Sequence, residues 1–224
     1  MGLDQTDIRK RHLDVYEEHP ELPFLEAIKR YYLQKSEVLL AQNSVSDYLK
    51  KAEGRLTEEE DRVDRYRDED TWKPLIGKCE HALVRRHLEP ICDGSRTLFD
   101  FDRFHDLERM HAMLSRIPDG LESFKKKFEE HVKKAGLRVV SQLVGEGTRG
   151  ADGLDPRAYV YALLEVRRKK SETVIRCFEG NARFVASLDS ACREFVNRNA
   201  ATGASTTESS ELLAKYADML LRTR

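Results

Sequence analysis

The amino-acid sequence predicts an all-α protein, and three observations support that fold class. Apolar residues make up 40% of the 224 residues and recur at three- and four-residue intervals, the spacing of one helix face. Charged residues make up 35%, against only 12 glycines and 6 prolines, a composition typical of solvated helices. No alternation of apolar and polar residues lasts long enough to predict a sheet. We expect roughly eight or nine helices from these apolar stripes.

The first helix is expected over residues 24–43, because Pro20 and Pro23 interrupt any earlier helical pattern. Ser44 then suits the N-cap of a second helix, since its hydroxyl can accept a free amide of the first turn. That second helix covers residues 48–66. The two helices should form a tight helix–turn–helix.

The segment 48–66 has the clearest amphipathic pattern of the chain. Its stripe consists of Tyr48, Leu49, Ala52, Leu56, Val63 and Tyr66. On the opposite side, Glu58 with Arg62 and Asp61 with Arg65 are spaced to form i,i+4 ion pairs. Such a helix packs by its stripe and stays soluble by its charges.

The rest of the chain continues the helical pattern, with an irregular stretch expected at residues 90–102. Asp155 and Pro156 are suited to the N-cap and first turn of a helix, and Gly180 with Asn181 to a turn. Further helical segments are expected at 71–88, 107–117, 121–143 (as one helix through Gly136 or two nearly collinear ones), 159–178, 184–195 and 211–221, the last with Leu212, Leu213, Tyr216, Leu220 and Leu221 facing inward.

Composition excludes several classes of protein. The formal net charge is −1, so no overall field favours nucleic acid or an anionic membrane. Cys79, Cys92, Cys177 and Cys192 include no Cys-x-x-Cys pair, which argues against a zinc module and favours reduced, buried thiols. No apolar run has the length of a membrane span, and no signal-peptide pattern opens the chain. We expect a location in the cytoplasm and nucleus.

Glu108 and His111 have the Glu-x-x-His spacing that puts a carboxylate and an imidazole on one helix face. Di-iron bundles use two such motifs with two further carboxylates, whereas this chain has one. The remaining histidines show neither His-Glu-x-x-His nor a cysteine at finger spacing. They are His12, His19, His81, His87, His105 and His131. Packing at the edge of a stripe is the simpler interpretation, and a helical metalloenzyme using Glu108 and His111 stays an alternative.

Other motifs also have a structural interpretation. The glycines of 145–150 match a dinucleotide-binding spacing but follow a helical stripe, so we expect a loop there. The basic clusters 125–127, 133–134 and 167–170 could touch phosphates, but acidic neighbours favour solvated helix faces. Trp72 is either a core anchor or an interface residue. No nucleophile motif is present, so we expect no enzyme.

Five stretches occur along the chain in one order. They are Tyr48-Leu-Lys-Lys-Ala-Glu to Tyr66; Lys78-Cys-Glu with His87-Leu-Glu; Asp106-Leu-Glu-Arg-Met through Ser115-Arg-Ile-Pro-Asp-Gly-Leu and Phe128-Glu-Glu-His; Asp155-Pro through Leu188-Asp-Ser-Ala-Cys to Asn197-Arg-Asn; and Glu211-Leu-Leu-Ala-Lys-Tyr. As a set they resemble the N-terminal arm of the cullin family, nearest to the cullins of Skp–F-box (SCF) ubiquitin ligases. The resemblance covers about residues 24–222.

The resemblance implies an elongated stack of cullin repeats, each a five-helix bundle. Residues 1–23 would be a partly ordered lead-in and 24–144 the second repeat of the arm. Residues 145–224 would be the start and much of the next repeat, with a mobile linker at 200–210. The family's first repeat is not recognisable upstream of residue 20, nor is its C-terminal domain recognisable in the chain. We therefore expect a segment or truncated form of a longer cullin, with a glycine loop longer than the family's connection.

The implied function is a non-catalytic scaffold, a rigid spacer between the substrate-receptor module and the RING end of a cullin–RING ubiquitin ligase. The resemblance implies no catalytic, cofactor-binding or metal-binding residues. Partners would be ubiquitin-ligase subunits or cullin regulators, reached through the full-length parent, with no nucleic acid and no membrane. We expect a monomer. The alternative from another class is a free-standing helical adaptor that binds a partner helix or peptide in a groove.

Overall fold

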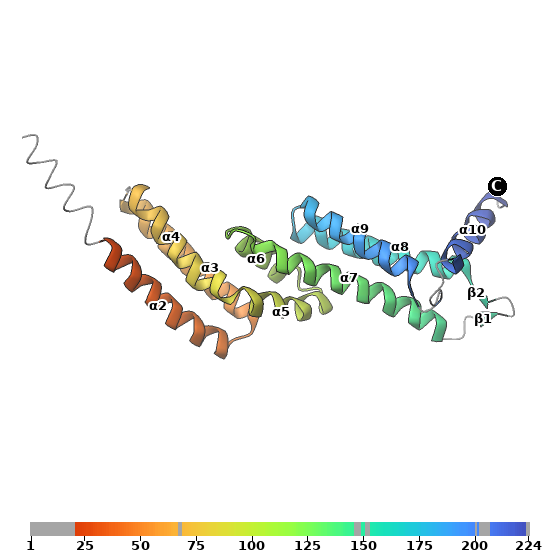
Figure 1. Ribbon diagram of the computed structural model, residues 1–224, viewed down its shortest axis with the longest axis horizontal. Helices are drawn as coiled ribbons and strands as arrows, with labels where there is room; N and C mark the ends of the chain where they lie inside the picture. The colour runs from red at the N-terminus through yellow and green to blue at the C-terminus, as the bar shows by residue number, and fades with distance from the viewer. Residues whose placement is uncertain are drawn as a thin grey trace, which may run out of the picture. The chain divides into compact units, whose positions relative to one another are not determined.

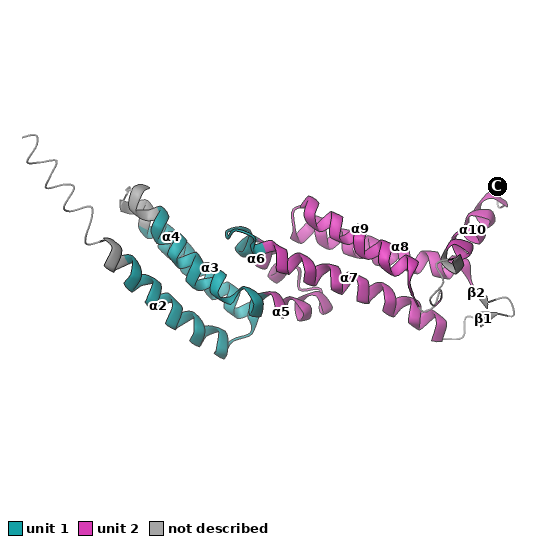
Figure 2. Ribbon diagram, in the orientation of Figure 1, with its two compact units in different colours: residues 1–91, 112–120 teal, residues 92–111, 121–224 magenta. Residues whose placement is uncertain are grey.

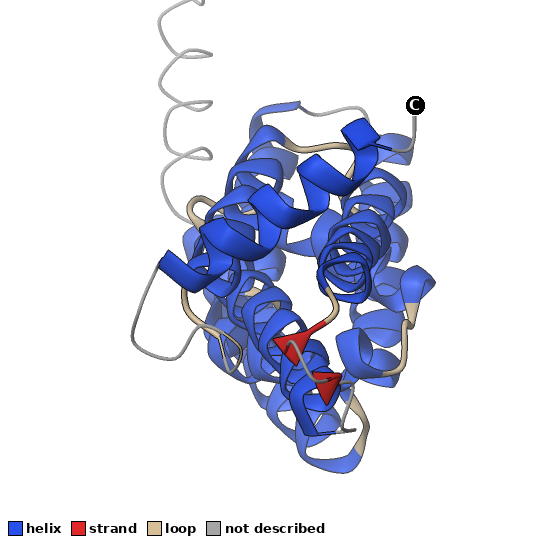
Figure 3. Cartoon of the chain, turned by 90° about the vertical axis from the view of Figure 1, so that its right-hand side faces the viewer, coloured by secondary structure: helices blue, strands red, loops and turns tan. Residues whose placement is uncertain are grey.

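The computed structural model describes residues 21–66, 69–145, 149–150, 153–199, 201 and 207–222. Within these ranges the chain forms nine α-helices, a short 3-10 helix and one pair of two-residue strands (Figures 1 and 3). The helices are α2 (Glu21–Gln42), α3 (Val45–Tyr66), α4 (Glu69–Leu83), η1 (Arg85–His87), α5 (Leu88–Asp100), α6 (Phe104–Ser115), α7 (Gly120–Gly145), α8 (Pro156–Cys177), α9 (Ala182–Asn197) and α10 (Thr207–Arg222). The predicted all-α class is confirmed.

The chain divides into two compact units, coloured separately in Figure 2. Unit 1 comprises residues 1–91 and 112–120, and unit 2 comprises 92–111 and 121–224. This division follows packing and not repeat boundaries. The boundary expected at 144/145 stays a prediction.

In unit 1, α2 packs against α4, and α3 packs against both. The Ser44 cap is confirmed, because the Asp47 amide donates to Ser44 Oγ at 3.1 Å. Helix α2 begins at Glu21, earlier than expected. Pro23 fits because it lies in the first turn, where a backbone N–H has no partner within the helix.

The irregular stretch expected at residues 90–102 is wrong for most of its length, because α5 continues to Asp100. Pro90 lies in the first turn of this helix, where proline is tolerated. Ile91, Leu98 and Phe99 then form a buried stripe at helical spacing. A proline in the first turn does not end a helix, so the buried stripe that follows it determines the structure here.

In unit 2, α7 runs unbroken through Gly136, which confirms the first of the two expected forms. Gly136 lies against the buried ring of Phe195, on α9. A Cβ at position 136 would lie 2.7 Å from Phe195 Cδ2 and closer still to Cγ. The glycine therefore permits a close approach of the two helices.

The predicted caps of α8 and α9 are confirmed. Asp155 accepts the Arg157 amide at 3.0 Å, and Pro156 occupies the first position of α8. Gly180 has a φ of +66°, the left-handed conformation that glycine adopts without strain. Asn181 then caps α9. The chain reverses between the two helices as expected.

Helix α10 packs against α8, with the Tyr161 and Tyr216 rings edge to face at a centroid distance of 6.1 Å. It begins at Thr207, earlier than the expected residue 211. The inward orientation predicted for this helix is wrong for Leu213, Leu220 and Leu221, which are 40%, 51% and 73% exposed. Among the described elements, α8 is the main neighbour of α10, and these leucines stay exposed beside it.

Two stretches expected to be loops are described only in part. The glycine stretch after α7 contains the short antiparallel pair β1 (Arg149–Gly150) and β2 (Gly153–Leu154). Residues 146–148 and 151–152 lie outside the described residues, as do 200 and 202–206 of the expected linker. The mobility expected of that linker therefore stays a prediction.

Candidate functional site

Glu108 and His111 do not come together as a metal site in the structure. The Glu108 side chain is 62% exposed and lies 3.7 Å from His105 Nδ1. His111 is buried, with its ring against Phe178 and Phe184. Burial lowers the pKa of His111. In the described part of the chain, no three His, Cys, Asp or Glu side chains are grouped as metal ligands.

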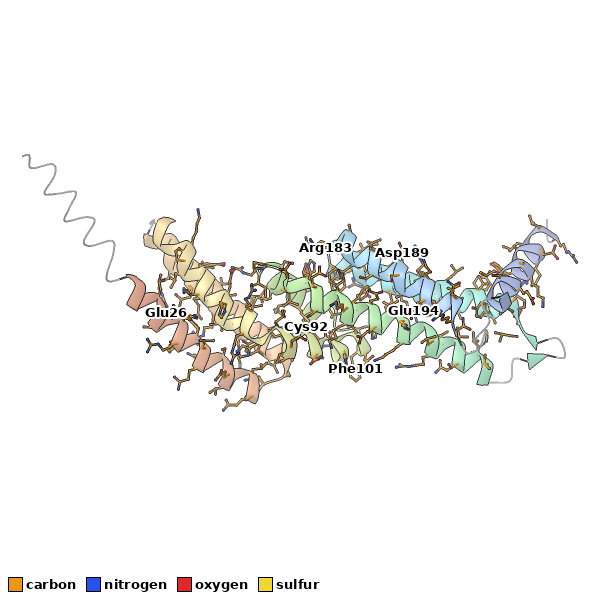
Figure 4. All side chains as sticks on the ribbon, viewed as in Figure 1. Glu26, Cys92, Phe101, Arg183, Asp189 and Glu194 are labelled. Carbon is orange, nitrogen blue, oxygen red and sulfur yellow. The ribbon has the colours of Figure 1, made fainter. Side chains whose placement is uncertain are left out.

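The basic clusters are largely neutralised by nearby carboxylates. The ion pairs are Lys125 with Glu122, Lys127 with Asp93, Lys133 with Glu194, Arg167 with Asp189, Arg168 and Lys169 with Glu165, and Lys170 with Asp102. Glu194 and Asp189 project from α9 (Figure 4). The solvated-face interpretation therefore fits cluster 167–170 fully and the other two clusters in part.

Two other sequence candidates remain open. Trp72 is in α4, but its side chain lies outside the described residues, so the choice between anchor and interface is untested. Of the glycines with dinucleotide-like spacing, Gly147 lies outside the described residues. Gly145 ends α7 and Gly150 belongs to β1, so the motif follows a helix and not a strand. Among the helices that the structure does describe, none has both the length and the apolar character needed to cross a bilayer.

The nearest approach to a catalytic pair is Ser36 with His87, which the sequence analysis missed. His87 Nε2 lies 2.8 Å from Ser36 Oγ. However, Ser36 is fully buried and its hydroxyl is placed to donate to the carbonyls of Leu33 and Ala82. No substrate can reach this buried oxygen, so we assign the pair a structural role. Its hydrogen bonds link α2 to the end of α4 and to η1. Burial lowers the pKa of His87, which favours the neutral ring.

Tyr48 extends this buried polar network to α3. Its side chain is fully buried, and its hydroxyl donates to the Leu83 carbonyl at 2.6 Å. The ring also meets His87 edge to face, with centroids 5.8 Å apart. Burial raises the pKa of Tyr48. These contacts fix three helices of unit 1 by groups that would be costly to leave unpaired.

A buried carboxylate, Glu59, was also missed. Its side chain is 5% exposed, accepts a hydrogen bond from the Tyr32 hydroxyl and pairs with Arg62 at 3.0 Å. The pairing expected between Glu58 and Arg62 is therefore wrong, and Glu58 pairs with Arg55 at 2.6 Å instead. Arg62 pairs with the more buried of the two carboxylates, which solvent alone would stabilise less well.

Unit 2 is built around an aromatic cluster made by Phe99, Phe124, Phe128, Phe178 and Phe184. All five rings are at most 2% exposed. They come from α5, α7, the end of α8 and α9. The cluster joins four elements in one core.

The burial expected of the cysteines is confirmed for Cys79, Cys92 and Cys177 but not for Cys192. Cys79, Cys92 and Cys177 are buried and reduced, and Cys192 is partly exposed and reduced. Burial raises the pKa of Cys79 to about 12 and of Cys177 to about 11. Thiols of this kind are poor nucleophiles near neutral pH.

His131 lies at the edge of the aromatic cluster. Its ring stacks on Phe99 at a centroid distance of 5.0 Å, and its Nδ1 lies 3.5 Å from Asp100 Oδ1. Its Nε2 is buried with no hydrogen-bond partner among the described residues. Burial, together with the charge of Lys170, lowers the pKa of His131 to about 4 against the opposing effect of Asp100 and Asp102.

We expect this histidine to make unit 2 less stable as the pH falls. The unfolded chain takes up a proton near pH 6.5 and the folded chain near pH 4, so the unfolded state binds more protons between these values. The contribution is present above pH 6.5 and is lost as the pH falls towards 4, by at most about 1.4 kcal/mol per pH unit. His131→Gln should flatten this slope in urea unfolding measured across that range.

His105→Gln is the matched control, because the His105 side chain is 94% exposed in the same unit. It should leave the slope almost unchanged. Equal slopes in the wild type and His131→Gln would contradict the prediction.

Comparison with known proteins gives one consistent result. The family described as "Cullin alpha solenoid domain" matches residues 1–224. The chain is 42% identical over 224 residues to Cullin-1 of Dictyostelium discoideum, 40% over 222 residues to Cullin-1 of Schizosaccharomyces pombe and 36% over 234 residues to Cullin-1 of Caenorhabditis elegans. Each alignment covers 99% of this chain. The chain spans 28%, 29% and 29% of the respective relatives.

Proposed function

The chain belongs to the cullin family, and on that premise we propose that it is a non-catalytic scaffold segment of a cullin–RING ubiquitin-protein ligase. The observation that carries the proposal is the match of the whole chain to the cullin α-solenoid domain. Its similarity to three Cullin-1 proteins supports a ligase of the SCF type. The chain spans less than a third of the length of those relatives, so its part in the activity of a whole cullin is proposed.

The proposed mechanism is positioning. A spacer that holds a substrate receptor and a RING end at a fixed separation raises the effective concentration of the two reacting groups without contributing a reactive group. This requires that the helices of the spacer do not slide past one another. The buried network of Ser36, Tyr48 and His87 in unit 1 supports that requirement, as does the aromatic cluster in unit 2.

We also propose that this segment has no catalytic residues. In support, the Ser36–His87 pair is buried, and the buried thiols have raised pKa values. Partners would be proteins, namely ligase subunits or cullin regulators reached through a full-length parent, with no nucleic acid and no membrane. We further propose a monomer that acts in the cytoplasm and nucleus.

A chimera tests the spacer role. The matching segment of Dictyostelium discoideum Cullin-1 is replaced by this chain, and substrate ubiquitylation is measured in the assembled ligase. A control chimera carries a Gly/Ser linker of equal residue number, which behaves as a flexible coil. We expect this chain to retain activity within about tenfold, and the linker to lose more than about tenfold because it does not fix the geometry.

Two results would overturn the proposal. Equal activity of the two chimeras would show that a fixed geometry is not what this segment provides. A chimera that folds, binds the other subunits and fails to ubiquitylate would show that this chain is not a working ligase spacer.

A further inference from the structure

A half-enclosed cavity of about 220 Å³ is lined by residues of α5 and α7, both within unit 2. Its cations are Arg96 from α5 and Lys127, Lys134 and Arg138 from α7. Spacings of seven and four residues put the three α7 cations on one helix face. The cavity gathers positive charge from two helices, although the whole chain is nearly neutral.

Carboxylates neutralise only part of this charge. Lys127 pairs with Asp93 at 2.8 Å. Among the described residues, no carboxylate lies within 4.0 Å of the charged nitrogens of Arg96, Lys134 or Arg138. These three side chains differ in this respect from the paired cluster 167–170 on α8.

Two carboxylates also line the cavity, and neither forms an ion pair with these three cations. Asp100 Oδ1 lies 3.5 Å from His131 Nδ1, and Glu130 is an exposed residue with no ion pair to a described side chain. Counting Asp93, the partner of Lys127, the four cations face three carboxylates, which leaves a net charge of about +1 with His131 neutral. This positive excess favours an anion, and a phosphate group carries about −1.5 to −2 near pH 7.

We propose that this cavity binds a phosphate group. A phosphate offers three strong acceptor oxygens, one for each of the three cations that lack a carboxylate partner, whereas one carboxylate of a protein offers two. Arginine forms paired hydrogen bonds to phosphate, so Arg96 and Arg138 are suited to hold it from two helices. The cavity is several times the roughly 30 Å³ of a water molecule, which leaves room for a phosphate and its linkage. The inference does not depend on the ligase role.

The probe is sodium pyrophosphate, titrated into the whole chain by calorimetry at fixed ionic strength. The pocket variant is Arg96→Gln/Lys134→Gln/Arg138→Gln. The matched control is Arg167→Gln/Arg168→Gln/Lys169→Gln, which removes the same charge from exposed positions on α8. We expect the pocket variant to weaken binding at least tenfold and the control to change it less than twofold. Circular dichroism checks that both variants fold.

Two outcomes would overturn the site. One is that the wild type shows no saturable binding up to about 10 mM pyrophosphate, a concentration well above the dissociation constant expected of a specific anion site. The other is an equal loss in both variants, which would show attraction by net charge alone. The His131 ring protons give an independent signal by NMR, and they should shift saturably with pyrophosphate because His131 lines the cavity.

A second arm identifies the source of the phosphate. A short phosphoserine peptide and its unphosphorylated counterpart are titrated in the same way. Tighter binding of the phosphopeptide than of pyrophosphate supports a phosphorylated protein segment as the ligand, and the reverse order supports a free phosphate compound. Equal binding of the two peptides, with no response to pyrophosphate, contradicts the proposal.

Discussion

Replacing Phe178 with alanine is expected to lower the free energy of unfolding of unit 2 by about 3–5 kcal/mol. The side chain is fully buried and its ring contacts four other phenylalanines. The nearest, Phe184, has its ring centroid 4.3 Å away. Truncation removes this apolar contact and leaves a cavity that the surrounding helices cannot fill without moving.

Hydrogen exchange of amides in α7, α8 and α9 measures the loss of stability within unit 2, and urea unfolding measures the loss for the whole chain. Phe101→Ala is the matched control, because Phe101 belongs to the same unit and is 73% exposed (Figure 4). It should change stability by less than about 0.5 kcal/mol. Similar losses in the two variants would show that the cluster does not hold unit 2 together.

Much of the fold could be predicted because helices leave local signals. The stripe is confirmed for Tyr48, Leu49, Ala52 and Leu56. This stripe, the Ser44 cap and the Asp155 cap each depend on residues within one or two turns of one another. The prediction at residues 90–102 was wrong because the local signal there is ambiguous. Pro90 ends a helix when it lies in the interior and is harmless in the first turn, and the sequence alone does not say which applies.

The buried polar contacts could not be predicted, because they join residues far apart in the chain. Ser36 and His87 are 51 positions apart, and Tyr32 and Glu59 are 27 apart. Glu59 follows the helical spacing of Ala52 and Leu56, which was the one available signal that it faces inward. Lys127 and Lys134 share a face at seven-residue spacing, but only the fold shows that Arg96 joins them.

Gly136→Val is expected to destabilise the chain by about 3 kcal/mol. The new Cβ alone would overlap the Phe195 ring, and the two methyl groups would add to the overlap. Phe195 is 1% exposed, so its ring has no free space to enter. The helices α7 and α9 must therefore separate or the ring must leave its rotamer, and both changes cost packing energy. Hydrogen exchange in α7 and α9 and urea unfolding measure the loss.

Gly54→Val separates this clash from the intrinsic effect of valine in a helix. Gly54 also lies in a helix interior, but a Cβ there would meet no atom within 4 Å. Because valine forms helices slightly better than glycine, this variant should change stability by less than about 0.5 kcal/mol. In a Phe195→Ala background the cost of Gly136→Val should fall, since the Cγ and Cδ atoms that collide are gone. An unchanged cost in that background would mean that the glycine is required for a reason other than the approach of Phe195.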